Sequence, residues 1–309
     1  MLTPKVGISR CLLGAEVRYD GTGAKASMPH SKLAGLFNYA DVCPEVAIGM
    51  SVPREPIRVI RDLDVVRVVG AVEGTQDYTP ALSQQAKEFI DDNRDLSGFI
   101  FMHNSPSCGT RNVKVYPTDG GPAVRNGQGV FAATVAQLWP ALPCEDGGRL
   151  FEDALRENFV TRVFAFAEWQ KVAPDLSAKA FIAFHSRYKY LLMAHSTPAY
   201  KEAGRLLSDL RGSDLHSDLE EIGATYIEIL MRGLQNIATR GGHANVLAHI
   251  QGYLKKHLSR TARQELAGLI DAYRKGEQPL LAPVALLKHH FREHPNEYVE
   301  MQAYLEPRR

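Results

Sequence analysis

The stretch Ile100-Phe-Met-His-Asn-Ser-Pro-Ser-Cys-Gly-Thr110 decides how the first half of the chain is organised. An apolar run from Gly98 to Met102 enters it, and turn-forming residues follow as far as Gly109. An apolar run that ends at such a turn is typical of a buried strand. Open α/β sheets carry their chemistry at the carboxyl ends of their strands, so Cys108 lies where a functional group is expected.

The same arrangement occurs twice earlier in the chain. Val6 to Ser9 predicts a strand that leads into Cys11, and Asn38 to Val42 predicts one that leads into Cys43. Because the carboxyl ends of parallel strands meet at one edge of a sheet, we expect these three thiols to converge. The remaining cysteine, Cys144, lies outside this pattern and is interpreted as structural.

The composition narrows the class of protein. The chain has 309 residues, with 36 Lys and Arg against 35 Asp and Glu, so its overall charge points to no particular partner. It contains no apolar run of about 18 residues and no signal peptide, which predicts a cytoplasmic protein without membrane contact. Its 4 cysteines at irregular spacing do not suggest a disulfide framework. No feature predicts an obligate protein partner.

The pattern of secondary-structure signals in the sequence changes near residue 150. Residues 1–149 alternate strand and helix signals, which predicts an α/β domain. They include a hairpin over Ile57–Val69 and a helix over Thr79–Ile90 with Thr79 as its N-cap. Residues 150–309 have the pattern of an all-α domain. We predict its helices at Phe151–Phe166, Leu176–Ala194, Ala199–Leu210, Ser217–Ala238, His243–His257, Ala262–Tyr273 and Pro283–His290.

Converging thiols have several possible roles. Thiolates are soft ligands that suit zinc, copper(I) or an iron–sulfur cluster, but no Cys-x-x-Cys pair of the kind zinc usually takes is present. Three thiolates on a four-iron cluster would leave one iron free to polarise a substrate atom. The alternative is that all three cysteines are buried as small apolar residues. Spacing alone leaves these interpretations open.

Longer blocks of sequence resemble a known family. The N-terminal blocks resemble the signature of thiouracil desulfidases, and residues 150–309 resemble the helical domain fused to it in bacterial tRNA 4-thiouridine desulfidases. The N-terminal blocks are Cys11-Leu-Leu-Gly14, Arg18-Tyr-Asp-Gly21, Cys43-Pro-Glu45 and Ser105-Pro-Ser-Cys-Gly109. The helical blocks are Phe184–Ser196, Gln251–Lys256, Tyr273–Gly276 with Pro279-Leu280, and Leu287–His289.

The resemblance implies a cofactor and a reaction. A [4Fe-4S] cluster would be held by Cys11, Cys43 and Cys108, and its open iron would bind the sulfur of 4-thiouridine in tRNA. Water would replace that sulfur, giving uridine and sulfide without net redox change. A free thiouracil or its nucleotide is the alternative substrate, and a cluster-bearing sensor or RNA-binding protein without enzymatic activity is the second alternative.

Such a reaction needs groups that move protons and orient the substrate. Glu45 is the first candidate for the general base because Pro44 fixes it two residues from Cys43; capping of the following helix or turn is its alternative. Ser105 and Ser107 are candidates for orienting substrate or water, although such serines also bond their own backbone.

Other candidates concern the substrate and RNA. Arg18 and Asp20 could hold a uracil edge or a phosphate, or pair with each other. In the helical domain the candidates for RNA contact are His185, Arg187, Lys189, Lys255 and Lys256. The last two belong to a predominantly basic stretch that suggests contact with RNA phosphates, or a solvated helix face balanced by acidic residues elsewhere. The stretch contains Arg232, Arg240, Lys255, Lys256, Arg260, Arg263, Arg274 and Lys275.

Overall fold

A parallel sheet brings the three cysteine-bearing segments together in the computed structural model, which describes residues 2–63, 65–72, 74, 76–208 and 216–306. The sheet has the strand order β2-β1-β5-β8, and every neighbouring pair is parallel. Its strands are β1 (Lys5–Ser9), β2 (Asn38–Val42), β5 (Leu96–Phe101) and β8 (Cys144–Asp146). The chain leaves β1 toward β2 and later returns to β5 on the other side of β1. Their carboxyl ends therefore flank a topological switch point, where α/β sheets form their binding crevice.

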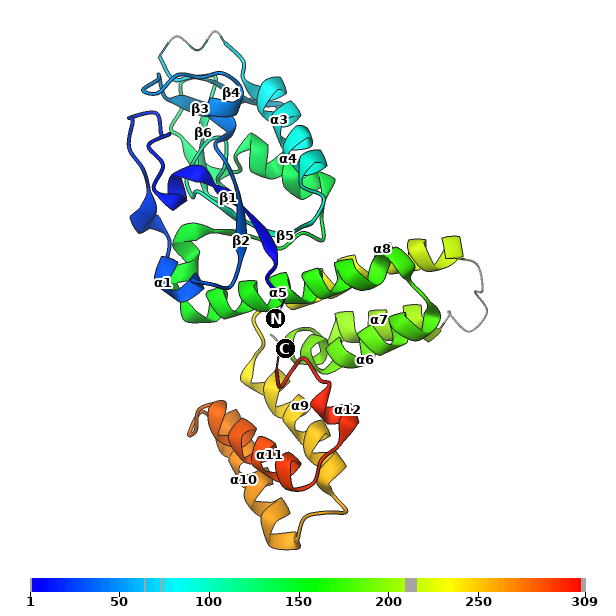
Figure 1. Cartoon of the computed structure of the whole chain (residues 1–309). Coiled ribbons are helices and arrows are strands. Elements are labelled where there is room, and N and C mark those ends of the chain that lie inside the picture. The colour runs from blue at the N-terminus through cyan, green and yellow to red at the C-terminus, as the bar shows by residue number, and fades with distance from the viewer. Residues whose placement is uncertain (1, 64, 73, 75, 209–215, 307–309) are drawn as a thin grey trace. The chain divides into compact units, whose positions relative to one another are not determined.

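Both faces of this sheet are buried, as Figure 1 shows. On one face Val6, Ile8 and Ile100 pack with Phe159 and Val163 of α5 (Asp153–Val172). On the other face, Phe99 and Phe101 form an aromatic cluster with residues of α3 (Thr79–Asp92) and α4 (Val130–Leu138). Continuous apolar strands are typical of parallel sheets covered on both faces, and β5 is buried along its whole length.

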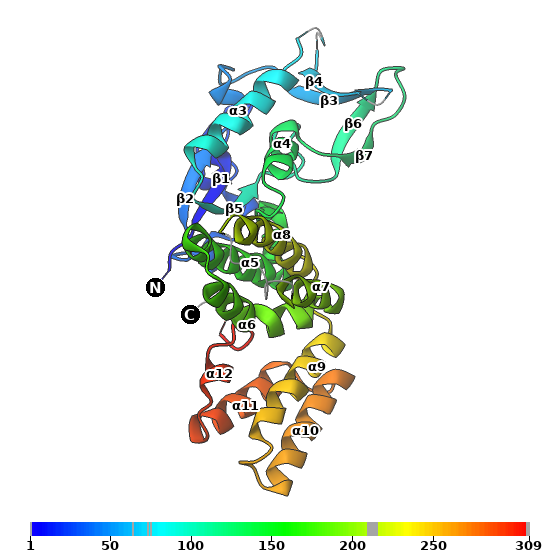
Figure 2. The same cartoon turned by 90° about the vertical axis from the view of Figure 1, so that its right-hand side faces the viewer.

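A second, mixed sheet has the strand order β4-β3-β6-β7. The predicted hairpin is formed by β3 (Ile57–Asp62) and β4 (Val65–Gly70), which pair antiparallel; Asp64 is not among the described residues. β6 (Val113–Pro117) pairs parallel with β3 and antiparallel with β7 (Val124–Gly127). Apolar residues of this sheet pack on α3 and α4, and Figure 2 shows the sheet beside those two helices.

The remaining helical elements of this part of the chain are short. They are η1 (Arg10–Leu13), η2 (Lys25–Ser27), α1 (His30–Leu33), α2 (Pro44–Ala47) and η3 (Gly147–Phe151). The predicted N-cap of α3 is wrong: Tyr78 is the cap residue, and the hydroxyl of Thr79 accepts a hydrogen bond from Val68 N at 2.8 Å. Thr79 therefore joins the helix to β4 instead of capping it.

The second part of the chain is helical. Its elements are η4 (Ala173–Asp175), α6 (Ala178–His195), α7 (Thr197–Ser208), α8 (His216–Leu234), α9 (Arg240–Gln251), η6 (Gly252–Leu254), α10 (Arg260–Lys275), α11 (Leu281–Glu293) and α12 (Glu297–Glu300). The predicted helices all appear with shifted ends, and residues 209–210 lie outside the described residues. Apolar residues from α6, α9, α10, α11 and α12 form one core, and Figure 2 shows α9, α10 and α11 side by side.

The predicted order, an α/β domain followed by an all-α domain, is confirmed. The chain divides into two compact units, Met1–Ala167 and Glu168–Arg309. The division lies within α5, because the first half of that helix supplies Phe159, Val163 and Phe164 to the α/β core. The boundary predicted between residues 149 and 150 stays a prediction. None of the described helices is both long enough and apolar enough to cross a membrane.

Candidate active site

The three predicted cysteines line one pocket of about 310 Å³ at the carboxyl ends of β1, β2 and β5. Cys11 follows β1 in η1, Cys43 follows β2 directly, and Cys108 lies in the loop after β5. Cys11 and Cys108 are buried and Cys43 is partly exposed; none of them forms a disulfide. Cys144 opens β8 and does not line this pocket. The sheet thus brings together the set of thiols predicted from strand-end positions.

The environment of these thiols favours their protonated form. Burial, followed by the neighbouring Cys43, raises the pKa of Cys11 to about 11. Burial raises the pKa of Cys108 to about 12, with further contributions from Glu45 and Cys11. The pKa of Cys43 is also raised, again mainly by burial. A cationic group bound among the three sulfur atoms in this pocket would stabilise all three thiolates.

The loop that carries Cys108 is held by the start of α4. Val130 N donates to the carbonyl oxygen of Pro106 at 3.2 Å, and Ala132 N donates to that of Ser107 at 3.2 Å. A side chain at Gly129 would place its Cβ only 2.4 Å from Ser107 C, so the close packing of these backbones requires glycine. The loop is therefore fixed by backbone contacts with the start of α4.

Glu45 lies in the pocket with both carboxylate oxygens engaged. Its Oε2 accepts hydrogen bonds from Arg54 Nε at 2.9 Å and Nη2 at 2.7 Å. Its Oε1 accepts from the hydroxyl of Ser107 at 2.6 Å. The side chains of Arg54 and Glu45 are only 5% and 12% exposed, so this ion pair is largely shielded from water. The hydrogen bonds described for this carboxylate run to Arg54 and Ser107 and not to the N-terminus of α2.

Ser107 and Ser105 have different surroundings. Ser107 Oγ donates to Glu45, and it lies 3.7 Å from Cys108 Sγ and 3.0 Å from Ser105 Oγ. Ser105 Oγ accepts from the backbone N–H groups of Ser107 at 3.3 Å and Cys108 at 3.1 Å. Ser105 thus shapes the loop, as loop serines often do, whereas Ser107 joins the carboxylate to a thiol.

Arg18 and Asp20 contact each other within one turn. Arg18 Nη1 lies 3.8 Å from Asp20 Oδ2 and donates to Thr22 Oγ1 at 3.1 Å. Hydrogen bonds from Thr22 lower the pKa of Asp20, with Arg18 as a weaker cause. The two side chains form an ion pair within this turn. Arg18 lines the cysteine pocket and Asp20 does not.

Arg54 is the site residue that the sequence reasoning missed. Besides Glu45 it holds two loops, donating from Nη2 to Val17 O at 2.9 Å and from Nη1 to Ser51 O at 3.2 Å. The signal that could have found it is a charged residue within the proline-bracketed break Val52-Pro-Arg-Glu-Pro56. Ser9 was also missed; its hydroxyl accepts from Met102 N at 2.9 Å and hydrogen bonds with Cys108.

The candidates on α6 are engaged inside the helical unit. His185 Nδ1 lies 3.2 Å from the hydroxyl of Tyr226, and burial lowers its pKa to about 4. Arg187 pairs with Glu168 at 2.8 Å and donates to Met301 O at 2.7 Å. The ammonium of Lys189 lies over the rings of Tyr190 and Tyr298. These side chains do not line the cysteine pocket, and their contact with RNA stays a prediction.

The basic stretch is partly neutralised. Arg232 pairs with Glu202 at 2.6 Å, and Arg274 and Lys275 both pair with Asp271 at 2.7 Å. Arg240 donates to the carbonyl oxygen of Tyr273 and lies over its ring. Lys255 and Lys256, by contrast, follow η6 at an exposed turn. Among the described residues, no carboxylate pairs with either of these two lysines.

Comparisons with known proteins agree with this layout. A family model described as 2-thiouracil desulfurase matches residues 6–147, and one described as a protein of unknown function (DUF1722) matches residues 189–308. The protein "Uncharacterized protein YbgA" of Escherichia coli (strain K12) is 36% identical over 151 residues, which are 48% of this chain and 88% of that protein. "Uncharacterized protein YbbK" of Bacillus subtilis (strain 168) is 32% identical over 136 residues, 42% of this chain and 88% of that protein.

A solved structure described as the [4Fe-4S]-dependent thiouracil desulfidase TudS is 27% identical. It covers 50% of this chain and 98% of its own, with a TM-score of 0.40. The sequence matches cover the strand-end cysteines and, separately, most of the helical part of the chain. The chain therefore belongs to the 2-thiouracil desulfurase family and is a desulfidase that carries a DUF1722 region after the family domain.

Proposed function

We propose that this protein is a cytoplasmic, iron–sulfur-dependent desulfidase that converts 4-thiouridine in tRNA to uridine and releases sulfide. The observation that carries the proposal is the meeting of Cys11, Cys43 and Cys108 with the Glu45–Ser107 pair in one pocket. Membership of the desulfurase family supports the removal of sulfur from a thiolated pyrimidine. The exposed lysines of the helical unit support RNA as the carrier of that base.

The residues present fit a [4Fe-4S] cluster. The donors are three soft thiol ligands in one cavity, and Cys144 does not line it. A cluster held by Cys11, Cys43 and Cys108 supplies, when bound, an iron without a protein ligand that acts as a Lewis acid for the substrate sulfur. The raised pKa values of the thiols mean that loading the site displaces protons.

Glu45 is the base in this proposal. Its Oε1 takes a proton from the attacking water, and Arg54 holds the carboxylate in one orientation through Oε2. The carbon–oxygen bond forms as the carbon–sulfur bond breaks, and the protons from water end on the departing sulfide. No electrons are gained or lost overall. Ser107 orients the water through its contact with Oε1, and Ser105 keeps Ser107 in place.

Free thiouracil or its nucleotide is the second candidate substrate. A pocket of about 310 Å³ is at the small end of the range for ligand sites, and it must hold the cluster as well, which favours a small substrate. The family description likewise concerns 2-thiouracil. RNA remains the first choice because the chain adds a large helical unit with exposed basic residues to this pocket.

The test is anaerobic. Iron and acid-labile sulfide are measured first, and sulfide release is then followed with 4-thiouridine-containing tRNA and with free 2-thiouracil. We expect about four irons per chain, with both the iron and tRNA turnover lost in Cys108→Ala. Cys144→Ala is the matched control and should keep both. Iron-free protein that still converts tRNA would exclude the cluster, and turnover of 2-thiouracil alone would exclude tRNA.

The contribution of the helical unit to tRNA binding is tested by reversing the charge of its exposed lysines. The double variant Lys255→Glu/Lys256→Glu should raise the KM for tRNA by at least about tenfold, since each phosphate contact contributes to affinity. The control for a change of charge is Lys171→Glu, which replaces one exposed lysine near the end of α5. Sulfide release from free 2-thiouracil should stay at the wild-type rate in all of these variants. An unchanged KM for tRNA would remove these lysines from the RNA contact.

A further inference from the structure

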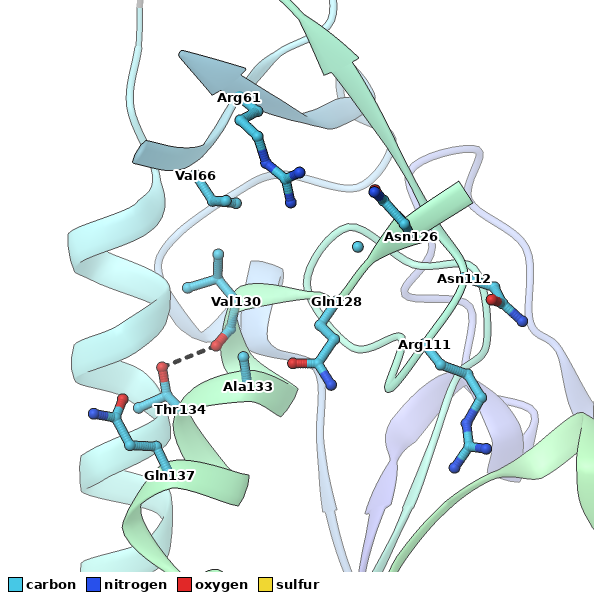
Figure 3. Close-up of a pocket in the computed structure, with 11 residues that line it drawn as sticks. Arg61, Val66, Arg111, Asn112, Asn126, Gln128, Val130, Ala133, Thr134 and Gln137 are labelled. Carbon is cyan, nitrogen blue, oxygen red and sulfur yellow. Dashed lines mark hydrogen bonds between the residues drawn. The ribbon is translucent and has the colours of Figure 1, made fainter. Parts of the chain in front are cut away.

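A second pocket lies behind the Cys108 loop. It has a volume of about 460 Å³ and lies between the β3–β4 hairpin, β7 and α4, as Figure 3 shows. Its walls carry two guanidinium groups and four carboxamides. These belong to Arg61, Arg111, Asn112, Asn126, Gln128 and Gln137. We name it the amide pocket. Its volume is that of a site for a ligand of nucleotide size.

The amide pocket carries positive charge and unused hydrogen-bond donors. No carboxylate of the described residues lines it. Arg111 Nη2 lies 3.8 Å from Glu145 Oε1, but that oxygen already accepts from Arg149 at 2.8 Å. Arg61 has no ion pair within the part of the chain that the structure describes. Arg61 is thus an exposed guanidinium without a carboxylate partner among the described residues, and Arg111 lies at the outer limit of an ion pair with Glu145. Guanidinium groups that are not fully engaged by carboxylates are suited to phosphate oxygens, which accept two parallel hydrogen bonds from one arginine.

The arrangement of the lining suits one unit of a strand. Figure 3 shows Arg61 and Arg111 apart, with Asn126 and Gln128 between them, and Val130 on the α4 side of the pocket. Carboxamides both donate and accept, so they can pair with the edges of a nucleobase. A nucleotide inside a strand has a phosphate on each side of its base, whereas a free mononucleotide has one. Two separated arginines with carboxamides between them match the former.

The amide pocket shares its wall with the cysteine pocket. Gly129 follows Gln128 and packs against the backbone of Ser107 and Cys108. Arg125 Nη1 donates to Asn104 Oδ1 at 3.0 Å, and Asn104 lines the cysteine pocket. The same nitrogen lies 3.4 Å from the carbonyl oxygen of Asn112, which lines the amide pocket. The two pockets are thus neighbours, separated by the Cys108 loop and the start of α4.

We propose that the amide pocket binds a non-thiolated nucleotide of the RNA substrate, with its flanking phosphates on Arg61 and Arg111 and its base on the carboxamides. The inference rests on the proposed function, because it presupposes an RNA substrate. It adds an RNA contact within the α/β unit to the one proposed for the helical unit. The ligand class is a nucleotide within a single strand, recognised by shape, charge and base edge.

The experiment uses the cluster-loaded, full-length chain without oxygen. The double variant Arg61→Gln/Gln128→Ala is compared with wild type and with Arg94→Gln, an exposed arginine of the same unit that lines neither pocket. Fluorescence anisotropy gives the Kd for 4-thiouridine-containing tRNA at several salt concentrations, and sulfide release gives kcat and KM. Uridine monophosphate serves as the free-nucleotide competitor.

We expect the double variant to bind tRNA about tenfold more weakly, with a salt slope lower by about one and a raised KM. Arg94→Gln should match wild type, and uridine monophosphate should compete poorly. Equal tRNA affinity in the double variant and wild type would overturn the inference, even if tRNA is desulfurised. Competition by uridine monophosphate as effective as that by RNA would overturn it in favour of a free nucleotide.

The two proposals fail differently. If wild type releases sulfide from free 2-thiouracil but not from tRNA, the proposed function is wrong. The anisotropy measurement then still decides whether the amide pocket contacts RNA: weaker RNA binding in the double variant supports that contact, and absent or unchanged RNA binding overturns it. If tRNA is turned over and bound equally by both proteins, only the amide pocket is wrong.

Discussion

Replacing Arg54 by Met should be one of the most damaging single changes in the α/β unit. The guanidinium makes two hydrogen bonds to Glu45 Oε2, at 2.9 and 2.7 Å, and one each to the carbonyl oxygens of Val17 and Ser51. With Arg54 5% and Glu45 12% exposed, the change leaves a largely buried carboxylate with Ser107 as its partner. Removing one partner of a buried ion pair costs about 3–5 kcal/mol.

The chain contains a matched control. Arg94 and Asp91 form an ion pair at 2.6 Å, close to the 2.7 Å of Arg54 and Glu45, but their side chains are 79% and 63% exposed. Exposed pairs contribute about 0–1 kcal/mol, so Arg94→Met should have little effect on the free energy of unfolding. The comparison holds the distance of the ion pair nearly constant and changes its burial, together with the two carbonyl hydrogen bonds that only Arg54 makes.

The assay is urea unfolding of cluster-free protein, followed by circular dichroism and by the fluorescence of Trp139 and Trp169, one in each unit. Glu45→Gln and the double variant Arg54→Met/Glu45→Gln complete a thermodynamic cycle. We expect the double variant to lose less than the sum of the single losses, because a neutral glutamine in place of Glu45 leaves no buried charge unpaired. A loss in Arg54→Met no larger than that in Arg94→Met would refute the reasoning.

Three further predictions follow from the site and from the helical unit. Ser107→Ala should keep its iron but lower kcat by about 100-fold, as expected when a group that guides proton transfer is lost; full iron with wild-type kcat would contradict this. Gly129→Ala should lose iron because its Cβ would lie 2.4 Å from Ser107 C, whereas Gly252→Ala, with nothing within 4 Å, should keep it. Burial, with His195 as a smaller cause, lowers the pKa of His243 to about 4. Between pH 6.5 and 4 the imidazole of His243 is therefore protonated in the unfolded chain but not in the folded one. Stability should therefore fall as the pH falls through that window, by at most about 3 kcal/mol from this group, and urea unfolding of His243→Gln should show a shallower fall.

The sequence predicted the meeting of the thiols because each cysteine is tied to a local pattern. An apolar run that ends at a turn identifies a strand end, and parallel pairing aligns the ends of β1, β2 and β5. Residues shortly beyond a strand end are then placed without knowing the rest of the fold. Glu45 and Ser107 could be selected for the same reason. Their hydrogen bond could not, since it joins residues 62 positions apart.

The features that the sequence did not predict show no periodic pattern of apolar residues and interact with residues far away in the sequence. Arg54 reaches Glu45 from a loop between two prolines, and no repeat in the sequence indicates where such a loop goes. β7, with the sequence Val124-Arg-Asn-Gly127, has the composition of a glycine-rich loop, because one apolar residue gives no alternation. The basic stretch is visible from its own composition, yet Glu202, which neutralises Arg232, lies 30 positions away.

The hydrogen bonds of Glu45 restrict where water can bind. A carboxylate oxygen accepts about two hydrogen bonds, and Arg54 fills both positions on Oε2. Ser107 takes one position on Oε1, which leaves a single position for water on that same oxygen. Water and Ser107 must therefore share Oε1, and the serine hydroxyl lies between that oxygen and Cys108 Sγ, 3.7 Å away. In the proposed mechanism the ion pair with Arg54 therefore does more than stabilise the fold: by filling Oε2 it would direct the attacking water to the side of the carboxylate that faces the thiols.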